Sequence, residues 1–320
     1  SWFGLDPITS GDMGFFYPQQ IKQYLNFPFT WETFREAGMG GVSFISQGVY
    51  FYNLPMGFLG QFFSYQIIER ILWFFPILAA GLIFPAILVK ELNIFPKKFY
   101  FLASLIYFLN TYFLMIMGGG QLTVALAYVM VPLVFALFLR VSRETNLKNI
   151  IFFSLSLAFL VAWDFRFAYL LGIIIGLYLL CFLPETIKNV QKYFKIFLIV
   201  SLFVLGFHAF WLLPFLLNYQ NPAASLTSAY TTNEAVRFFS FADFSHSFSL
   251  LHPNWPEDIF GKTYFLQWEF LILPILAFSS LLFMGNKKGL TRFFVILGLG
   301  GTFLAKGSNE PFGEIYLWMF

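Results

Sequence analysis

The sequence predicts an all-α integral membrane protein, a polytopic bundle of about eight transmembrane helices. Three observations support this fold class. Of the 320 residues, 59% are hydrophobic and only 11% are charged, whereas soluble domains carry roughly a quarter charged residues. The apolar residues gather in runs bounded by charged, Gly or Pro residues, as a hydrocarbon core about 30 Å thick requires of spanning helices. The basic residues fall on alternate loops between these runs, the pattern of helices that cross a membrane in turn.

The elements are predicted in order along the chain. Residues 1–65 are polar, aromatic and Gly-rich by comparison, so we expect a folded first loop with short helices rather than a span. Apolar runs long enough for spans are expected at residues 71–89, 99–117, 121–139, 150–163, 167–183, 196–217, 264–284 and 293–304. The predicted organisation after the first loop is six spans over 66–217, a loop over 218–263, two spans over 264–305 and a closing segment over 306–320.

The orientation follows from the charges, because Lys and Arg near span ends stay cytoplasmic. One set of alternate loops holds 12 of the 19 basic residues. These are Lys90, Lys97, Lys98, Arg140, Arg143, Lys148, Lys188, Lys192, Lys195, Lys287, Lys288 and Arg292. We therefore expect an integral protein of the cell membrane whose first loop is extracytoplasmic. No basic tract suggests nucleic acid as a partner.

The first loop carries the most informative motif, LDPITSGDMGFFYPQQIKQYL from Leu5 to Leu25. It places Asp6 and Asp12 just before a helix expected to begin near Pro18, since Pro suits a first helical turn. Gly11 lets the backbone bend and a ligand approach Asp12 closely. The alternative is that Asp12 or Ser10 only caps this helix.

A second motif, GGVSFISQGVYFYNLPMGFLGQFF over residues 40–63, precedes the first predicted span. Its Tyr52 and Asn53 are of the types that bind sugars, because sugar rings stack on aromatic rings and their hydroxyl groups bond to amides. The alternative is a belt of aromatic residues at the membrane interface.

Taken with the closing LAKGSNEPFGEIYLW motif (residues 304–318), the "GD…YP" and "YNLPMG" elements resemble those of GT-C superfamily glycosyltransferases, especially the arabinofuranosyltransferase-like and YfhO-like branches. The resemblance implies transfer of a sugar from a polyprenyl-phosphate donor to a hydroxyl of a glycan, lipid or protein acceptor. It implies Asp12 as catalytic base, with Asp6 as second choice, and Tyr17, Tyr52 and Asn53 as substrate contacts. Family members have further spans at both ends, so we expect this chain to be a fragment.

Displacing a lipid phosphate also needs a cation that holds the phosphate. Arg166 in WDFRFAY is the first candidate, since a guanidinium binds phosphate bidentately and keeps its charge near lipid, and Asp164 is predicted to orient it. The alternative is a structural ion pair in the tight turn of a helical hairpin. Arg70 beside Glu69 is a second phosphate candidate, although snorkelling to the interface explains it as well.

The remaining predictions concern His208, metals and rival functions. His208 in GFHAFW is a candidate substrate contact, although a lone histidine in a span is more often a packing residue. The metal site is unknown, and the one cofactor considered is a divalent cation that Asp12 and Asp164 would share if the first loop folded over the hairpin. The rival functions are a transporter or flippase of a lipid-linked sugar, in which the same charges line a pathway, and a non-catalytic membrane subunit.

Overall fold

The structure is a computed structural model of the 320-residue chain. It describes residues 6–8, 12, 18–25, 31–32, 41–42, 50–94, 96–217, 232–238, 240, 242–249, 268–283 and 288–319. The chain divides into two compact units. Unit 1 comprises residues 1–109, 113–172 and 189–218, and unit 2 comprises residues 110–112, 173–188 and 219–320.

The described part of the chain is almost entirely helical. Its helices before the turn at residue 119 are α1 (Pro18–Gln23), α2 (Tyr50–Leu59), α3 (Tyr65–Glu69), the π-helical η3 (Arg70–Phe74), α4 (Phe75–Leu92), the 3₁₀ turn η4 (Lys97–Phe99), α5 (Tyr100–Phe108) and α6 (Thr111–Gly118). The next helices are α7 (Leu122–Arg143), α8 (Leu147–Trp163), α9 (Phe165–Cys181), α10 (Leu183–Lys188) and α11 (Val190–Leu217). Two two-residue strands, β1 (Trp31–Glu32) and β2 (Gly41–Val42), pair antiparallel in the first loop, with Trp31 opposite Val42.

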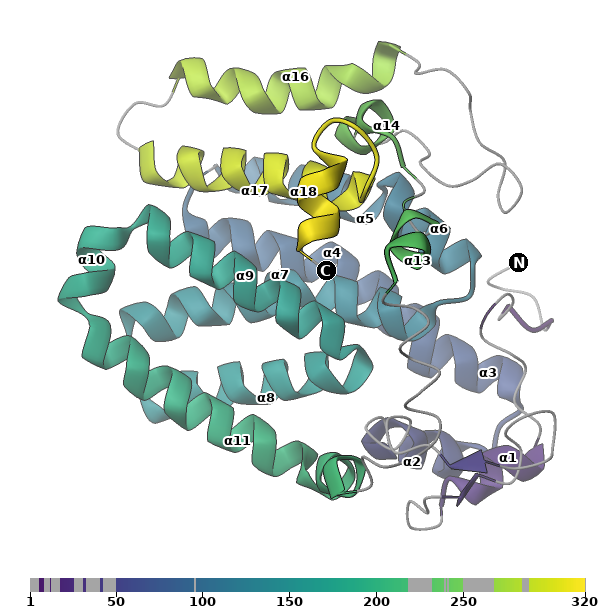
Figure 1. The fold of residues 1–320 in the computed structure, drawn as a ribbon. Coiled ribbons are helices and arrows are strands. Elements are labelled where there is room, and N and C mark those ends of the chain that lie inside the picture. The colour runs from purple at the N-terminus through teal and green to yellow at the C-terminus, as the bar shows by residue number, and fades with distance from the viewer. Residues whose placement is uncertain are drawn as a thin grey trace. The chain divides into compact units, whose positions relative to one another are not determined.

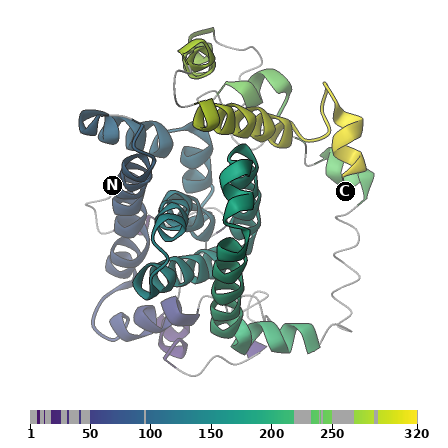
Figure 2. The same ribbon diagram turned by 90° about the vertical axis from the view of Figure 1, so that its left-hand side faces the viewer.

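Unit 2 holds the shorter closing helices. These are α13 (Asn233–Phe238), α14 (Phe244–Phe248), η6 (Trp268–Leu271), α16 (Ile272–Ser279), η7 (Ser280–Phe283), α17 (Lys288–Lys306) and α18 (Gly313–Trp318). Figure 2 shows the light green α14 packed beside the yellow-green α17.

The long apolar helices make this an integral membrane protein, but the prediction of eight spans is wrong. Within the described residues, four helical stretches are long and apolar enough to cross a membrane, or five if the bent pair α5 and α6 forms one broken span. The four are Tyr65–Leu92, Leu122–Arg143, Val190–Leu217 and Lys288–Lys306. Of the other predicted spans, α8 and α9 are apolar but have 17 residues each, against the roughly 20 that a span needs. The described part of the predicted span 264–284 contains the short apolar helix Ile272–Leu282, and residues 264–267 and 284 lie outside the described residues.

Helix α7 is the centre of unit 1. It packs against α4 on one side and α8 on the other, and α8 also packs against α11 (Figure 1). Of the most apolar part of α7, 72% is buried, against 22% for α11. The outer helices therefore leave large apolar side chains such as Phe75, Phe194 and Leu202 exposed, as a lipid environment allows.

Ion pairs and connectivity define the two ends of unit 1. Glu91 near the end of α4 pairs with Arg140 and Arg143 near the end of α7, and Lys192 near the start of α11 donates to the carbonyl oxygen of Ser142. Several of the basic loops predicted to lie on one side of the membrane thus meet at one end, which we call the basic end. The opposite end holds η3, the start of α7 and the turn between α8 and α9.

Candidate functional site

The candidate site lies at the end of unit 1 opposite the basic end. Part of the first loop is attached there by Glu69 and Arg70, at the junction of α3 and η3. The fully buried Glu69 carboxylate accepts hydrogen bonds from the Ile8 backbone N–H at 2.7 Å and from Arg70 Nη1 at 2.9 Å. Arg70 Nη2 donates to the main-chain carbonyl oxygen of Asp6 at 2.9 Å. The side chain of Arg70 is only 11% exposed, and its contacts attach the first loop to this end of unit 1.

Asp12 is held by the turn between α6 and α7. Its backbone N–H donates to the Gly119 carbonyl oxygen at 2.8 Å, and its Oδ2 accepts from Gln121 Nε2 at 2.8 Å. Gly120 adopts a positive φ of 75° in this turn, a conformation that glycine adopts without strain. Asp12 is exposed, so its carboxylate is oriented by Gln121 and still reaches solvent.

The helix predicted to begin near Pro18 is α1, and its first residue is Pro18. The side-chain bond of Asp12 goes to Gln121 rather than to this helix. This contact distinguishes Asp12 from a simple helix cap. Tyr17 lies outside the described residues.

Asp164 and Arg166 close the hairpin between α8 and α9. Asp164 is 8% exposed and ends α8 with an extended backbone. Its Oδ1 accepts from the Arg166 backbone N–H and Nε, both at 2.9 Å, and its Oδ2 accepts from Arg166 Nη2 at 2.6 Å. The Arg166 side chain is 67% exposed. The pair thus buries the carboxylate and presents the guanidinium outward.

An aromatic cluster of Phe51, Tyr52, Trp73 and Trp163 joins α2, η3 and the end of α8. The centroid of the Tyr52 ring lies 4.9 Å from that of the Trp73 ring and 4.3 Å from that of the Trp163 ring. Both pairs of rings meet edge to face. Trp73 and Trp163 are 5.7 Å apart, and Phe51 lies 5.8 Å from Trp163. The predicted sugar contact Tyr52 therefore lies beside the residue that precedes Asp164.

Two polar atoms of this cluster lack partners. The hydroxyl of Tyr52 and Nε1 of Trp73 are buried and form no hydrogen bond. Burial raises the pKa of the Tyr52 hydroxyl, which therefore stays protonated at neutral pH and keeps its proton to donate. Neither atom has the partner that a buried polar group normally finds.

Aromatic contacts and hydrogen bonds connect α7 to α9 and to α5 at this end of unit 1. Tyr128, in the second turn of α7 after Gln121, lies edge to face with Phe167 at 6.4 Å, one residue beyond Arg166. Tyr107 and Tyr128 exchange hydrogen bonds, each hydroxyl donating to the other's carbonyl oxygen at 2.7 and 3.0 Å. Asp12, Arg70, Tyr52 and the Asp164–Arg166 pair thus belong to one unit and to the same end of it.

His208 is buried between α8 and α11. It is 2% exposed, and Trp211 Nε1 donates to its Nδ1 at 2.8 Å. An indole nitrogen can only donate, so Nδ1 is the acceptor and Nε2 carries the proton that bonds to the Ala158 carbonyl oxygen at 3.0 Å. Both ring nitrogens of His208 therefore form hydrogen bonds with groups of α8 and α11.

Asn53, the other predicted sugar contact of the second motif, is half-buried in α2.

The contacts of Asp164 do not fit a divalent cation shared with Asp12, which was considered for the case that the first loop folds over the hairpin. Both carboxylate oxygens of Asp164 accept from Arg166, and a guanidinium would repel a metal ion at that position. Within the described residues, no three His, Cys, Asp or Glu side chains gather in one group.

The closing motif is a tightly bonded turn in unit 2. Lys306 is 1% exposed, and its Nζ donates to the Gly307 carbonyl oxygen at 3.1 Å. Asn309 Nδ2 donates to the carbonyl oxygens of Ser240 and Ala242, both at 2.7 Å. These bonds attach the segment after α17 to the segment between α13 and α14, a structural role for the motif's polar residues.

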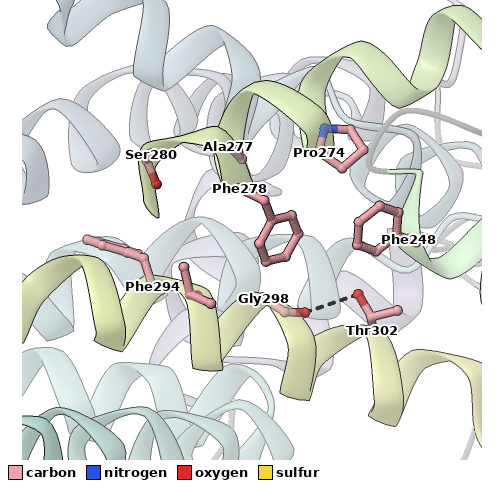
Figure 3. A pocket seen from close by; sticks show the side chains of 9 residues that line it. Phe248, Pro274, Ala277, Phe278, Ser280, Phe294, Gly298 and Thr302 are labelled. Carbon is pink, nitrogen blue, oxygen red and sulfur yellow. Dashed lines mark hydrogen bonds between the residues drawn. The ribbon is translucent and has the colours of Figure 1, made fainter. Parts of the chain in front are cut away.

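Unit 2 also contains an apolar cavity of about 120 Å³ between α14, α16 and α17 (Figure 3). Phe248, Phe278 and Phe294 line it. The hydroxyl of Thr302 donates a hydrogen bond to the carbonyl oxygen of Gly298 in the same helix, at 3.0 Å (Figure 3). The cavity is therefore lined mainly by apolar side chains, with the hydroxyl groups of Ser280 and Thr302 as its polar side-chain groups.

Sequence reasoning missed four residues of the candidate site: Glu69 as an anchor, Trp73, Gln121 and Trp163. Trp73 and Trp163 each lie at a predicted span end, where an aromatic residue is expected at the interface in any case. No signal in the sequence pairs Gln121 with a residue 109 positions earlier.

Comparisons with known proteins give no further guidance, since no family, curated protein or solved structure matches this chain.

Proposed function

We propose that the protein transfers a sugar from a polyprenyl-phosphate donor to an acceptor hydroxyl, in the manner of GT-C glycosyltransferases. The observation that carries this proposal is the position of Asp12. Its carboxylate is exposed, bonded through one oxygen to Gln121, and located at the end of unit 1 opposite the basic loops. A base in this reaction needs such a fixed carboxylate within reach of a hydroxyl group.

The proposed step forms one bond and breaks another. Asp12 accepts the proton of the acceptor hydroxyl while the acceptor oxygen attacks the anomeric carbon. The bond between that carbon and the phosphate oxygen breaks, and polyprenyl phosphate leaves with the electron pair. The exposed guanidinium of Arg166 stabilises the phosphate by charge-assisted hydrogen bonds. Asp6 is the weaker candidate base, since its contact with Arg70 uses only its main chain.

The distribution of basic residues gives the expected orientation of the site in the membrane. The basic end holds Arg140, Arg143 and Lys192, and such loops stay cytoplasmic. The candidate site would then face the outer side of the membrane, with a glycan, a lipid or a protein as acceptor.

Asp12→Asn tests the proposal, with the protein in liposomes and a panel of polyprenyl-phosphate sugars as donors. We expect loss of transfer by about 10²- to 10⁴-fold, the usual contribution of a general base, with unchanged expression and thermal stability. Glu234→Gln, an exposed carboxylate in α13 of unit 2, is the matched control and should transfer at the wild-type rate. Full turnover by Asp12→Asn would remove Asp12 as base, and loss in Asp6→Asn instead would give that role to Asp6.

A flippase of a lipid-linked sugar is the second candidate, and one observation favours it. Helices α5 and α6 are bent by 50° at a short break, and broken helices are typical of transporters. Liposomes separate the two functions: a flippase moves a labelled lipid-linked sugar between leaflets without an acceptor, whereas a transferase consumes the donor only when an acceptor is present.

A further inference from the structure

The unpartnered polar atoms of the aromatic cluster call for an explanation. The described residues contain four buried side-chain polar atoms without a hydrogen bond, those of Tyr52, Trp73, Ser154 and Ser247. Two of the four belong to rings whose centroids are 4.9 Å apart. A buried polar group left without a partner destabilises the folded protein, so two in adjacent rings indicate a function that compensates.

The chemistry of the pair is that of a carbohydrate site. The indole N–H only donates, whereas the phenol hydroxyl donates and accepts, so together they match sugar hydroxyl groups, which do both. The surrounding rings of Phe51 and Trp163 provide the apolar faces on which sugar CH groups pack.

The position of the pair agrees with this chemistry. Trp73 lies one helical turn after Arg70, in the π-helical segment η3, and π-helical turns are frequent at functional sites. Trp163 directly precedes the buried Asp164, whose partner Arg166 presents its guanidinium outward. A sugar at the aromatic cluster would thus have its phosphate near a cation.

We propose that Tyr52 and Trp73 bind the hydroxyl groups of the donor sugar, with Trp163 as part of the apolar wall. This inference rests on the proposed function for the identity of the donor. Both polar atoms are covered in this structure, so the sugar enters when α2, which carries Tyr52, moves away from η3 and the end of α8. Helix α2 is a ten-residue helix outside the spans, so its displacement leaves the membrane helices in place.

Binding measurements on the purified full chain test this inference without requiring turnover. The probes are farnesyl phosphate and its esters with mannose, glucose and arabinose, titrated in detergent by calorimetry. The wild type should bind at least one ester at least about tenfold more tightly than farnesyl phosphate. Tyr52→Phe and Trp73→Phe each remove one polar atom, and each should reduce that sugar-dependent preference about tenfold, the equivalent of one hydrogen bond of about 1.4 kcal/mol. Affinity for farnesyl phosphate itself should not change.

The controls are Ser154→Ala and Ser247→Ala, which remove the other two unpartnered hydroxyls and should keep the preference. In ligand-free protein, Tyr52→Phe should unfold at the wild-type temperature or above it, because a buried unpaired group has been removed. If Trp73→Phe does not fold, the sugar-dependent preference of Tyr52→Phe alone tests the inference. The inference is wrong if the wild type shows no preference for any ester, or if the preference survives in both variants.

The two proposals fail separately. Asp12→Asn should retain the sugar preference although it cannot transfer. A protein that transfers sugar, but whose preference survives Tyr52→Phe and Trp73→Phe, overturns only the sugar-binding pair. A protein that shows the preference, loses it in these variants and transfers nothing overturns only the proposed reaction.

Discussion

Gln121 Nε2 lies 2.8 Å from Asp12 Oδ2, and this bond joins the first loop to the start of the most buried span of unit 1. It fixes one oxygen of a carboxylate that is otherwise exposed. Since catalytic groups work best when held by neighbouring residues, Gln121 is a positioning residue for the proposed base.

Replacing Gln121 tests this role. Gln121→Met keeps the length of the side chain and removes its donor, so we expect kcat to fall about tenfold, as the loss of one bond of about 1.4 kcal/mol in the transition state implies. KM for the donor should stay unchanged. Gln121→Glu should lower kcat further, because a second carboxylate repels Asp12. Wild-type kcat in both variants would mean that the bond has no part in catalysis.

Arg166→Ala separates a structural ion pair from a phosphate ligand. Its removal leaves the buried Asp164 with only the backbone N–H of residue 166, so the free energy of unfolding should fall by about 1–3 kcal/mol. Affinity for farnesyl phosphate should also fall about tenfold. Unchanged affinity together with lower stability would leave the pair a purely structural role. Arg237→Ala is the matched control, since Arg237 pairs with Glu314 on the surface, where a pair contributes about 0–1 kcal/mol.

The helical nature of the chain could be predicted because apolar runs between charged loops are a strong signal. The number of spans could not. Asp164 ends α8 after 17 residues, and the break between α5 and α6 divides another apolar run. The break at Asp164 was predicted between the expected spans 150–163 and 167–183. Hydropathy does not reveal the break between α5 and α6, because the residues on both sides of it remain apolar.

The sequence pointed to some residues of the candidate site, but not to the residues that hold them in place. Asp164 and Arg166 were expected to form a pair because they are two residues apart, and the structure contains that pair. Arg70 was predicted as a phosphate candidate, but its bond to the Asp6 carbonyl oxygen, 64 residues away, was not predicted. Contacts between distant segments depend on tertiary packing, which local sequence patterns do not contain.

Packing between α4 and α5 gives a prediction about stability. A Cβ atom at Gly81 would lie 2.0 Å from Cδ2 of Phe108, so Gly81→Ala forces the ring aside and should cost about 1–3 kcal/mol. Gly176→Ala is the control, since no atom lies within 4 Å of its Cβ position, and alanine in a helix should be neutral or stabilise by up to about 1 kcal/mol. Thermal unfolding in detergent compares the two. Equal unfolding temperatures would contradict the close approach of α4 and α5.

Cysteine labelling tests the orientation on which the proposed outer-face reaction depends. In a Cys181→Ser background, Gln61→Cys places a thiol in the exposed turn after α2, at the candidate-site end. Glu144→Cys places one in the exposed loop after α7, at the basic end. Because basic loops stay cytoplasmic, a membrane-impermeant maleimide should label only Gln61→Cys in intact cells, and both variants after permeabilisation. Labelling of Glu144→Cys alone in intact cells would place the candidate site on the cytoplasmic side. The donors available there would be soluble nucleotide sugars rather than a lipid carrier that faces outward.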